Sequence, residues 1–299
     1  MQAAFSVSGA TLIMAAERRG MNSFMSWVGG KKSLRDKLLI RFPLEYGRYI
    51  EVFGGAGWLL FHKPPESFEV FNDMNSNLVN LYRCVREDPR KLIYRLKYMI
   101  NARDDFRCIL EQRRRGLFAR FRDYDRAAKF YYLIQFSYGH KTDQYCCRPV
   151  AMWKKFPLIE RAAARLQSVA IENRDFESLI KLYDRPDSFF YCDPPYYATE
   201  DFYKDVDFTR EDHIRLRNTL LECEGKFLVS YNDCPEIREI WNVPGIYIES
   251  VTRLNNLALR YESGAEYHEV FISNYDTSER RNADRQLSLL DDGEEGIYL

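Results

Sequence analysis

The chain is 299 residues long and carries 44 lysines and arginines against 44 acids, so its formal net charge is zero. Hydrophobic residues make up 46% of it and aromatic residues 15%, which excludes a disordered chain and fits one α/β catalytic domain plus a smaller module. The apolar runs are too short to span a bilayer, which argues against a membrane protein. We therefore expect a folded cytoplasmic protein.

Seven cysteines are scattered along the chain, and none forms a pair at the two-residue spacing of zinc ribbons and fingers. A zinc site at His140, Cys146 and Cys147 would need a fourth ligand. The pattern favours free thiols in a reducing compartment and no bound metal.

The first predicted elements form a β-α-β-α unit. Residues 48–53 (RYIEVF) predict a strand that enters a glycine-rich turn, and an apolar helix begins after this turn at Trp58. A second strand over 68–72 ends before Asp73, and leucines, Tyr and Val at helical spacing predict a helix over 76–86.

The middle of the chain has a different pattern. Residues 88–166 predict long charged helices rich in Arg, Tyr and Phe, interrupted by a turn-like segment over 137–149. Residues 82–165 hold 21 lysines and arginines against 9 acids, so a strongly basic region hides within the neutral chain. Such a region is typical of a surface that neutralises phosphates, although a solvated helical face with paired acids explains the charge equally well.

Alternation of strands and helices then resumes. We expect strands over 169–172, 188–192, 226–231, 245–251 and 269–273, and helices over 176–182 and 210–223. The predicted organisation is thus a catalytic domain over 23–87 and 167–275, a mainly helical insertion over 88–166, a disordered extension over 1–22 and a disordered acidic tail over 276–299.

The strongest chemical signal is an apolar strand that ends in Asp193, Pro194, Pro195 and Tyr196. The carboxyl ends of strands face the ligand crevice in an open α/β sheet, and prolines leave rigid carbonyl groups free to accept. The Asp193 carboxylate and the Pro194 carbonyl can each accept one hydrogen from an NH2 group, while Tyr196 stacks on the ring that carries it. The sequence therefore predicts an active site for an aromatic amine, which needs two acceptors because its lone pair is delocalised.

Residues 193–196 (Asp-Pro-Pro-Tyr) resemble the motif of amino-methylating DNA methyltransferases. The order of three further motifs, at 27–31 (Trp-Val-Gly-Gly-Lys), 53–57 (Phe-Gly-Gly-Ala-Gly) and 72–75 (Asn-Asp-Met-Asn), resembles that of the Dam-like adenine methylases, the D12 class. The resemblance covers residues 24–275. It implies a Rossmann-like α/β sheet that uses S-adenosylmethionine, with a target-recognition domain inserted between the cofactor motifs and the catalytic motif.

The resemblance also assigns cofactor residues. Gly55 and Gly57 let the backbone approach a cofactor closely, and Asp73, the acid at the end of the second strand, can bind ribose hydroxyls. The family pattern implies that Trp27 and Lys31 flank the methionine end of the cofactor and that Asp175 and Phe176 hold its adenine ring, although that last pair could equally be a helix cap and its hydrophobic staple. The resulting set of cofactor residues is Trp27, Lys31, Phe53, Gly55, Gly57, Asp73, Asp175, Phe176 and Asp193.

The insertion is expected to contact duplex DNA. We expect phosphate contacts from the arginine run and base contacts from the polar turn, and the residues assigned to DNA are Arg113, Arg114, Arg115, Lys141, Gln144 and Arg148. The turn does not match the recognition hairpin of the GATC-specific members, so that specificity is not transferred. The family is also compatible with a cognate restriction endonuclease as partner, and we expect a monomer.

Two alternatives remain at this point. The same tetrapeptide serves cytosine N4 and RNA bases, so the amine could belong to another nucleobase. A DNA-binding regulator that keeps the fold without turnover is disfavoured because Asp73, Asp193 and Tyr196 are intact.

Overall fold

The computed structural model describes residues 20–27, 29–121, 123–147, 149, 151–197, 208–254 and 266–282. Within these ranges the chain forms a seven-stranded sheet with the order β3-β2-β1-β4-β5-β7-β6. The strands are β1 (Arg48–Glu51), β2 (Glu69–Asn72), β3 (Val169–Glu172), β4 (Ser188–Cys192), β5 (Lys226–Asn232), β6 (Tyr247–Leu254) and β7 (Glu266–Ser273). The expected α/β architecture is confirmed.

The direction of the strands places the functional crevice. Strands β1 to β5 run parallel, whereas β7 lies antiparallel between β5 and β6. The order reverses at β1, which pairs with β2 on one side and β4 on the other. Ligands bind beyond the carboxyl ends of the strands at such a switch point, so the segments after β1, β2 and β4 define the place to look for a site.

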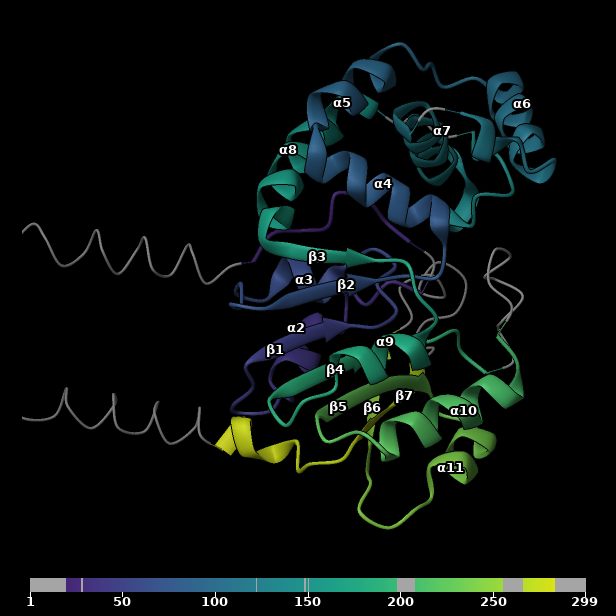
Figure 1. Ribbon diagram of the computed structural model, residues 1–299. Helices are drawn as coiled ribbons and strands as arrows, with labels where there is room; N and C mark the ends of the chain where they lie inside the picture. The colour runs from purple at the N-terminus through teal and green to yellow at the C-terminus, as the bar shows by residue number, and fades with distance from the viewer. Residues whose placement is uncertain are drawn as a thin grey trace, which may run out of the picture.

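Helices cover the faces of the sheet and one of its edges. Helix α2 (Arg35–Leu39) precedes the first strand, and those that follow strands are α3 (Trp58–His62), α4 (Ser76–Glu87), α9 (Phe176–Tyr183), α10 (Arg210–Leu221) and α11 (Pro235–Trp241). The remaining helices are α5 (Pro89–Lys97), α6 (Arg103–Arg114), α7 (Asp123–Phe136) and α8 (Phe156–Arg165), with short 3-10 helices at 117–120, 138–140, 152–155 and 166–168. Figure 1 shows α4 to α8 gathered beyond the β3 edge of the sheet.

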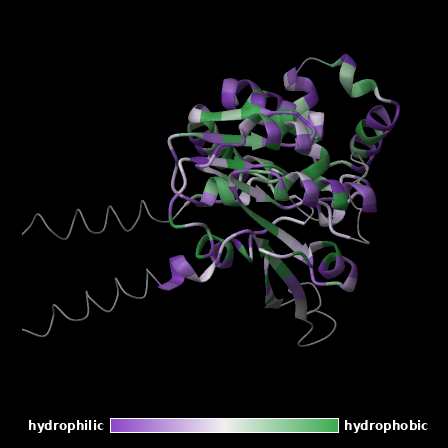
Figure 2. Cartoon of the chain, turned by 60° about the horizontal axis from the view of Figure 1, so that its bottom comes forward, coloured by the Kyte–Doolittle hydropathy of each residue, from purple (hydrophilic) through white to green (hydrophobic). Residues whose placement is uncertain are grey.

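The helical region is continuous with the core of the sheet. Strands β2 and β4 are buried at every position, and the strands appear mainly hydrophobic in Figure 2. One hydrophobic cluster joins α7 residues such as Tyr131 to Tyr82 of α4 and Phe71 of β2. The Tyr131 hydroxyl also donates to the Phe24 carbonyl at 2.8 Å. Helices α5 to α8 therefore share one hydrophobic core with the sheet, and α4 lies between them and the sheet.

Element boundaries differ from the sequence predictions in a few places. The first strand ends at Glu51 and not at residue 53, because the chain turns into the glycine loop there. Strands β6 and β7 are longer than expected because they pair with each other along their whole length. Helices α2 and α11 were not predicted, since each is shorter than eight residues and gives little periodic signal.

At both ends of the domain, a few residues that the sequence assigns to the extensions make contacts with the domain. The Met21 amide donates to the Phe61 carbonyl at 2.9 Å, and Asn22 accepts from Arg35 at 2.8 Å. At the other end, Arg280 donates to the Pro43 carbonyl at 2.6 Å. Residues 20–22 and 276–282 thus contact the domain, and the rest of the two expected extensions lies outside the described residues.

All seven cysteines lie within the described residues and are free. Among the residues that the structure describes, His, Cys, Asp and Glu form no group of three or more that could hold a metal ion. No helix in the described ranges is both long and apolar enough to cross a membrane.

Candidate active site

A cavity opens at the carboxyl ends of β1, β2 and β4. Its lining includes eight of the residues predicted for the site, namely Lys31, Phe53, Gly55, Asp73, Asp175, Phe176, Asp193 and Pro195. Five separate stretches of sequence therefore converge where the strand order reverses. Glu51, Phe208 and Arg215, which were not predicted from the sequence, also line the cavity.

The glycine loop after β1 forms one wall of the cavity. Gly55 and Gly57 have φ values of 49° and 63°, in the left-handed region that glycine tolerates. A Cβ atom on Gly55 would lie 3.0 Å from the Trp27 ring, so the predicted Trp27 packs directly behind the loop. A Cβ atom on Gly57 would lie 3.0 Å from the Tyr82 hydroxyl, so backbone conformation and close packing both favour glycine at the two positions.

Asp73 fixes this loop to the end of β2. Its Oδ2 atom accepts from the Gly55 amide at 2.9 Å, and its Oδ1 atom accepts from the Asn75 amide at 2.8 Å. Asn75 in turn caps α4, accepting from the amides of Asn77 and Leu78. Each carboxylate oxygen has more than one lone pair, so Asp73 can accept further hydrogens from a ligand while it holds the loop.

Aromatic rings form a second wall. The Phe53 ring centroid lies 5.7 Å from that of Phe176 and 5.8 Å from that of Phe208. The Arg215 guanidinium lies 4.0 Å from the Phe176 ring centroid. A flat heteroaromatic ring suits such a wall, because it can pack against aromatic surfaces.

Asp175 is both a helix cap and a member of the cavity lining. Its side chain accepts from the Glu177 amide at 3.0 Å, so Asp175 is the N-cap of α9. A helix cap was the alternative to a cofactor contact at this position. Arg215 also grips it with two hydrogen bonds of 2.8 and 2.9 Å. Burial raises the pKa of Asp175, but the hydrogen bonds and charge of Arg215 outweigh burial and hold the pKa below its ordinary value. The carboxylate is therefore charged and fixed in direction.

The predicted catalytic motif lies after β4, beside a buried lysine. Lys31 is 5% exposed, its Nζ atom lies 2.8 Å from Asp193 Oδ1, and it also donates to the Tyr196 hydroxyl. The same ammonium lies 4.2 Å from the centroid of the Tyr196 ring. The structure thus brings the first and last predicted motifs into direct contact across more than 160 residues.

Two further residues, neither of them predicted from the sequence, complete this cluster. Ser230 on β5 donates to Asp193 Oδ1 at 3.0 Å. Glu269 on β7 accepts from the Tyr196 hydroxyl at 2.8 Å and lies 3.7 Å from Lys31 Nζ. Burial raises the pKa of Asp193, and the charge of Glu269 adds to this effect, while Lys31 opposes it. The only sequence signal for Glu269 was an acid at the start of an otherwise apolar predicted strand.

Glu51 is an acid buried in β1 at the floor of the cavity. Its Oε2 atom accepts from the Tyr49 hydroxyl at 2.8 Å and from the Leu60 amide at 3.0 Å. Burial raises the pKa of Glu51 to about 8, in spite of these hydrogen bonds. At neutral pH this carboxyl is therefore mostly protonated, unlike Asp175 in the same cavity.

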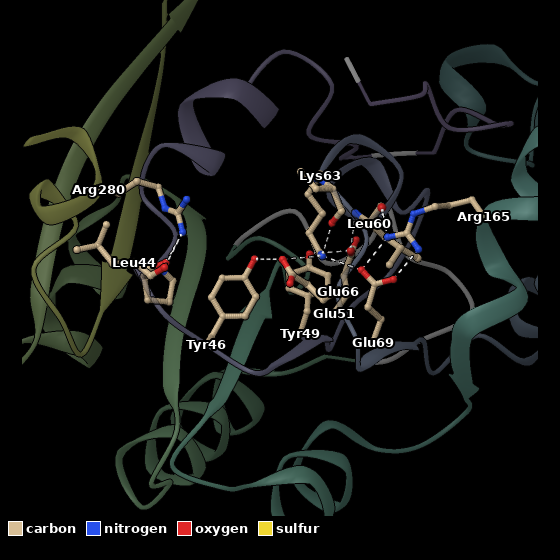
Figure 3. A network of polar contacts seen from close by, with 12 residues as sticks. Leu44, Tyr46, Tyr49, Glu51, Leu60, Lys63, Glu66, Glu69, Arg165 and Arg280 are labelled. Atoms are coloured by element: carbon tan, nitrogen blue, oxygen red, sulfur yellow. Dashed lines mark hydrogen bonds and ion pairs between the residues drawn. The ribbon is translucent and has the colours of Figure 1, made fainter. Parts of the chain in front are cut away.

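A network of ion pairs and hydrogen bonds lies next to Glu51 (Figure 3). Glu69 at the start of β2 pairs with Lys63 at 2.6 Å and with Arg165 at 2.5 and 2.7 Å. Burial raises the pKa of Glu69, but Arg165 and Lys63 together hold it below the ordinary value. Arg165 is the last residue of α8, so its contacts with Glu69 connect the last helix of the basic region to the sheet.

The residues assigned to DNA occupy different environments. Arg113 donates to the Thr142 hydroxyl and therefore supports the polar turn, whereas Arg114 and Arg115 are exposed, Arg115 with a 2.8 Å contact to Glu111. The Tyr138 amide donates to the Gln144 carbonyl at 2.7 Å, so the turn is a hairpin that carries Lys141 and an exposed Gln144. Arg148 lies outside the described residues.

The sequence matches a known family over most of its length. A family model described as D12 class N6 adenine-specific DNA methyltransferase matches residues 27–255. The chain is 25% identical over 285 residues to a Type II methyltransferase, M1.LlaDCHI, from Lactococcus lactis subsp. cremoris, a match that covers 88% of this chain and 99% of the relative. It is also 26% identical to a DNA adenine methylase from Vibrio cholerae serotype O1, over 73% of this chain and 84% of the relative.

A third relative is the Type II methyltransferase M.CviBI from Paramecium bursaria Chlorella virus NC1A, which is 26% identical over 74% of this chain and 87% of its own length. The fold, the cavity and the family match agree. The chain belongs to the D12 class of N6 adenine-specific DNA methyltransferases. Its activity is the methylation of adenine N6 in DNA, as the resemblance in the sequence predicted.

Proposed function

We propose that this enzyme methylates an adenine that has been flipped out of duplex DNA, and that the cavity at the end of β1, β2 and β4 holds both the adenine and S-adenosylmethionine. The observation that supports this most directly is the convergence of Asp73, the glycine loop and Asp193 on one cavity. A base inside a duplex cannot reach such a cavity, and flipping it out costs a few kcal/mol.

The lining of the cavity suits S-adenosylmethionine, because it offers both aromatic rings and charged acceptors. We assign the adenine ring of the cofactor to the wall formed by Phe53, Phe176 and Phe208, with Asp175 accepting from its amino group. Asp73 is assigned to the ribose hydroxyls, because a charged acceptor at the end of β2 suits them. When bound, S-adenosylmethionine supplies the methyl group from its sulfonium.

We assign the methionine end of the cofactor to the region of Lys31 and Trp27. Lys31 lines the cavity and is held by Asp193, while Trp27 packs behind the glycine loop. Gly57 keeps that loop tight through its left-handed conformation and is a member of the same site.

The target amine is assigned to the end of β4. Lys31 and Ser230 contact Asp193 at Oδ1, and we assign one amine hydrogen to Oδ2 and the other to the Pro194 carbonyl. Pro195 keeps the segment rigid, and Tyr196 stacks on the flipped base, which contributes about 1 to 3 kcal/mol and offsets much of the cost of flipping. Positioning of the amine for in-line attack provides most of the rate, with no covalent intermediate.

The basic region over 88–166 is proposed as the module that binds DNA. We assign phosphate contacts to Arg113, Arg114 and Arg115, with Arg113 also supporting the hairpin through Thr142. Base edges are assigned to Lys141, Gln144 and Arg148, because a projecting polar hairpin can enter the major groove.

Duplex DNA is the macromolecular partner in this proposal, and the working unit is a cytoplasmic monomer. The names of the Type II relatives suggest a cognate restriction endonuclease as a second partner. DNA from a methylation-free host that expresses this chain can be challenged with a panel of endonucleases. An endonuclease that is blocked at its own site identifies the specificity that such a partner must share, and cleavage by the whole panel contradicts a partner of any of these specificities.

The proposed function is tested by following tritiated methyl groups into duplex DNA, single-stranded RNA and protein in parallel. Label in duplex DNA alone, abolished by Asp193→Ala, supports it. Label in RNA, or label in DNA that Asp193→Ala does not reduce, contradicts it.

A further inference from the structure

We propose that Glu269 is a positioning residue whose charge, acting through Lys31, sets the preference of the cavity for the positively charged methyl donor over its neutral product. The proposal rests on the proposed function of the cavity. It concerns a residue beyond the part of the chain that the family model matches, which ends at residue 255.

Glu269 is placed behind the catalytic residues by the antiparallel part of the sheet. It is 1% exposed and pairs with Asn232 on β5 and Val251 on β6, so its backbone is held on both sides. Its Oε2 atom accepts from the Tyr196 hydroxyl at 2.8 Å and lies 3.7 Å from Lys31 Nζ. The residues that line the cavity include Lys31 and Asp193, and Glu269 acts from behind them.

The arrangement places one ammonium between two carboxylates. Lys31 Nζ lies 2.8 Å from Asp193 and 3.7 Å from Glu269, so its charge is shared between a residue in the cavity and one behind it. All three side chains are at least four-fifths buried, with exposed fractions of 5%, 18% and 2% respectively. Charges interact strongly where water is excluded, so a change of one unit at Glu269 is felt in the cavity.

S-adenosylmethionine and S-adenosylhomocysteine differ by one methyl group and one positive charge at sulfur. Replacing Glu269 by glutamine makes the site more positive by one unit, whatever else contacts this residue. The charged ligand is then disfavoured relative to the neutral one. At a separation on the order of 10 Å and an effective dielectric constant of about 20, one unit of charge shifts the ratio of the two affinities on the order of ten-fold.

A purely structural role for Glu269 makes a different prediction. The Glu269→Gln variant keeps an oxygen that accepts from Tyr196, so a residue that only holds this hydroxyl would be replaced with little effect. Any general loosening of the site would weaken both ligands alike, because they share every atom except the methyl group. The ratio of the two dissociation constants therefore separates charge from structure.

The test is isothermal titration calorimetry of the full chain with S-adenosylmethionine and with S-adenosylhomocysteine. In Glu269→Gln we expect the dissociation constant of the charged ligand to rise about ten-fold relative to that of the neutral ligand. The matched control is Glu249→Gln on the neighbouring β6, where the carboxylate pairs with Arg41 at 2.6 Å. This control has the same change of charge and should leave the ratio unaltered.

A second variant, Glu269→Asp, keeps the charge but shortens the reach to Tyr196, and its ratio should remain that of the wild type even if both affinities fall. An unchanged ratio in Glu269→Gln, or an equal shift in Glu269→Asp, would overturn the proposal. Failure of the wild type to bind either ligand would contradict the proposed cofactor site itself, which is a different outcome.

Discussion

The stability of the enzyme should depend on pH through Glu51. This carboxyl is buried in β1 and has a pKa of about 8, compared with an ordinary value of 4.5. Between these two values the folded protein keeps the proton on Glu51, whereas the unfolded chain releases it. Since the folded state binds more protons, the contribution of Glu51 to the free energy of unfolding falls as pH rises from about 5 to 8.

The size of the effect follows from the shift of the pKa. Each pH unit between the two values costs about 1.4 kcal/mol of unfolding free energy, so the change from pH 5 to pH 7 is about 3 kcal/mol. A glutamine at this position does not titrate, and its carbonyl can still accept from Tyr49 and the Leu60 amide. Glu51→Gln should therefore gain about 3 kcal/mol relative to the wild type as pH rises from 5 to 7.

Urea denaturation of both proteins at pH 5, 6 and 7 measures this difference. Glu249→Gln is the control, because Arg41 holds the pKa of Glu249 below its ordinary value and this carboxyl does not titrate in the same window. A difference between Glu51→Gln and the wild type that is the same at all three pH values would refute the reasoning.

Three further predictions concern the proposed site. Asp193→Ala should abolish methyl transfer while leaving the melting temperature within a few degrees of the wild type, and appreciable turnover would remove Asp193 from the active site. Asp73→Ala should weaken S-adenosylmethionine binding by ten-fold or more in calorimetry, because it removes a charged acceptor worth about 1.5 to 3 kcal/mol as well as the anchor of the Gly55 amide; an unchanged dissociation constant would place the ribose elsewhere. Arg114→Ala should weaken binding to all DNA sequences and lower the slope of log affinity against log salt concentration by about one unit. Arg148→Ala should instead relax the methylated sequence at one base position. An unaltered methylated sequence in both variants would show that base reading lies elsewhere.

Much of the sheet and of the candidate site could be predicted because the sequence signals are local. The strand before Asp193, the glycine loop and the acid after β2 are each contained in fewer than ten residues, and parallel strands bring their carboxyl ends to one edge of the sheet. The pattern therefore identified both the elements and the edge at which they meet. The short helices α2 and α11 gave too little periodicity to be found.

The missing parts of the site depend on contacts between distant segments. Glu269 meets Tyr196 across 73 residues, and only the antiparallel insertion of β7 between β5 and β6 brings it there. Arg215 similarly joins Asp175 from a helix 40 residues away. Composition also could not distinguish the members of the arginine run. Arg113 donates to Thr142 of the hairpin, whereas Arg114 is exposed.

The most direct test of the account is mass spectrometry of nucleosides from unmethylated duplex DNA incubated with the enzyme and S-adenosylmethionine. The account predicts N6-methyladenine as the product with the wild type and none with Asp193→Ala. The appearance of N4-methylcytosine in place of N6-methyladenine, or equal amounts of N6-methyladenine from the two proteins, would contradict it.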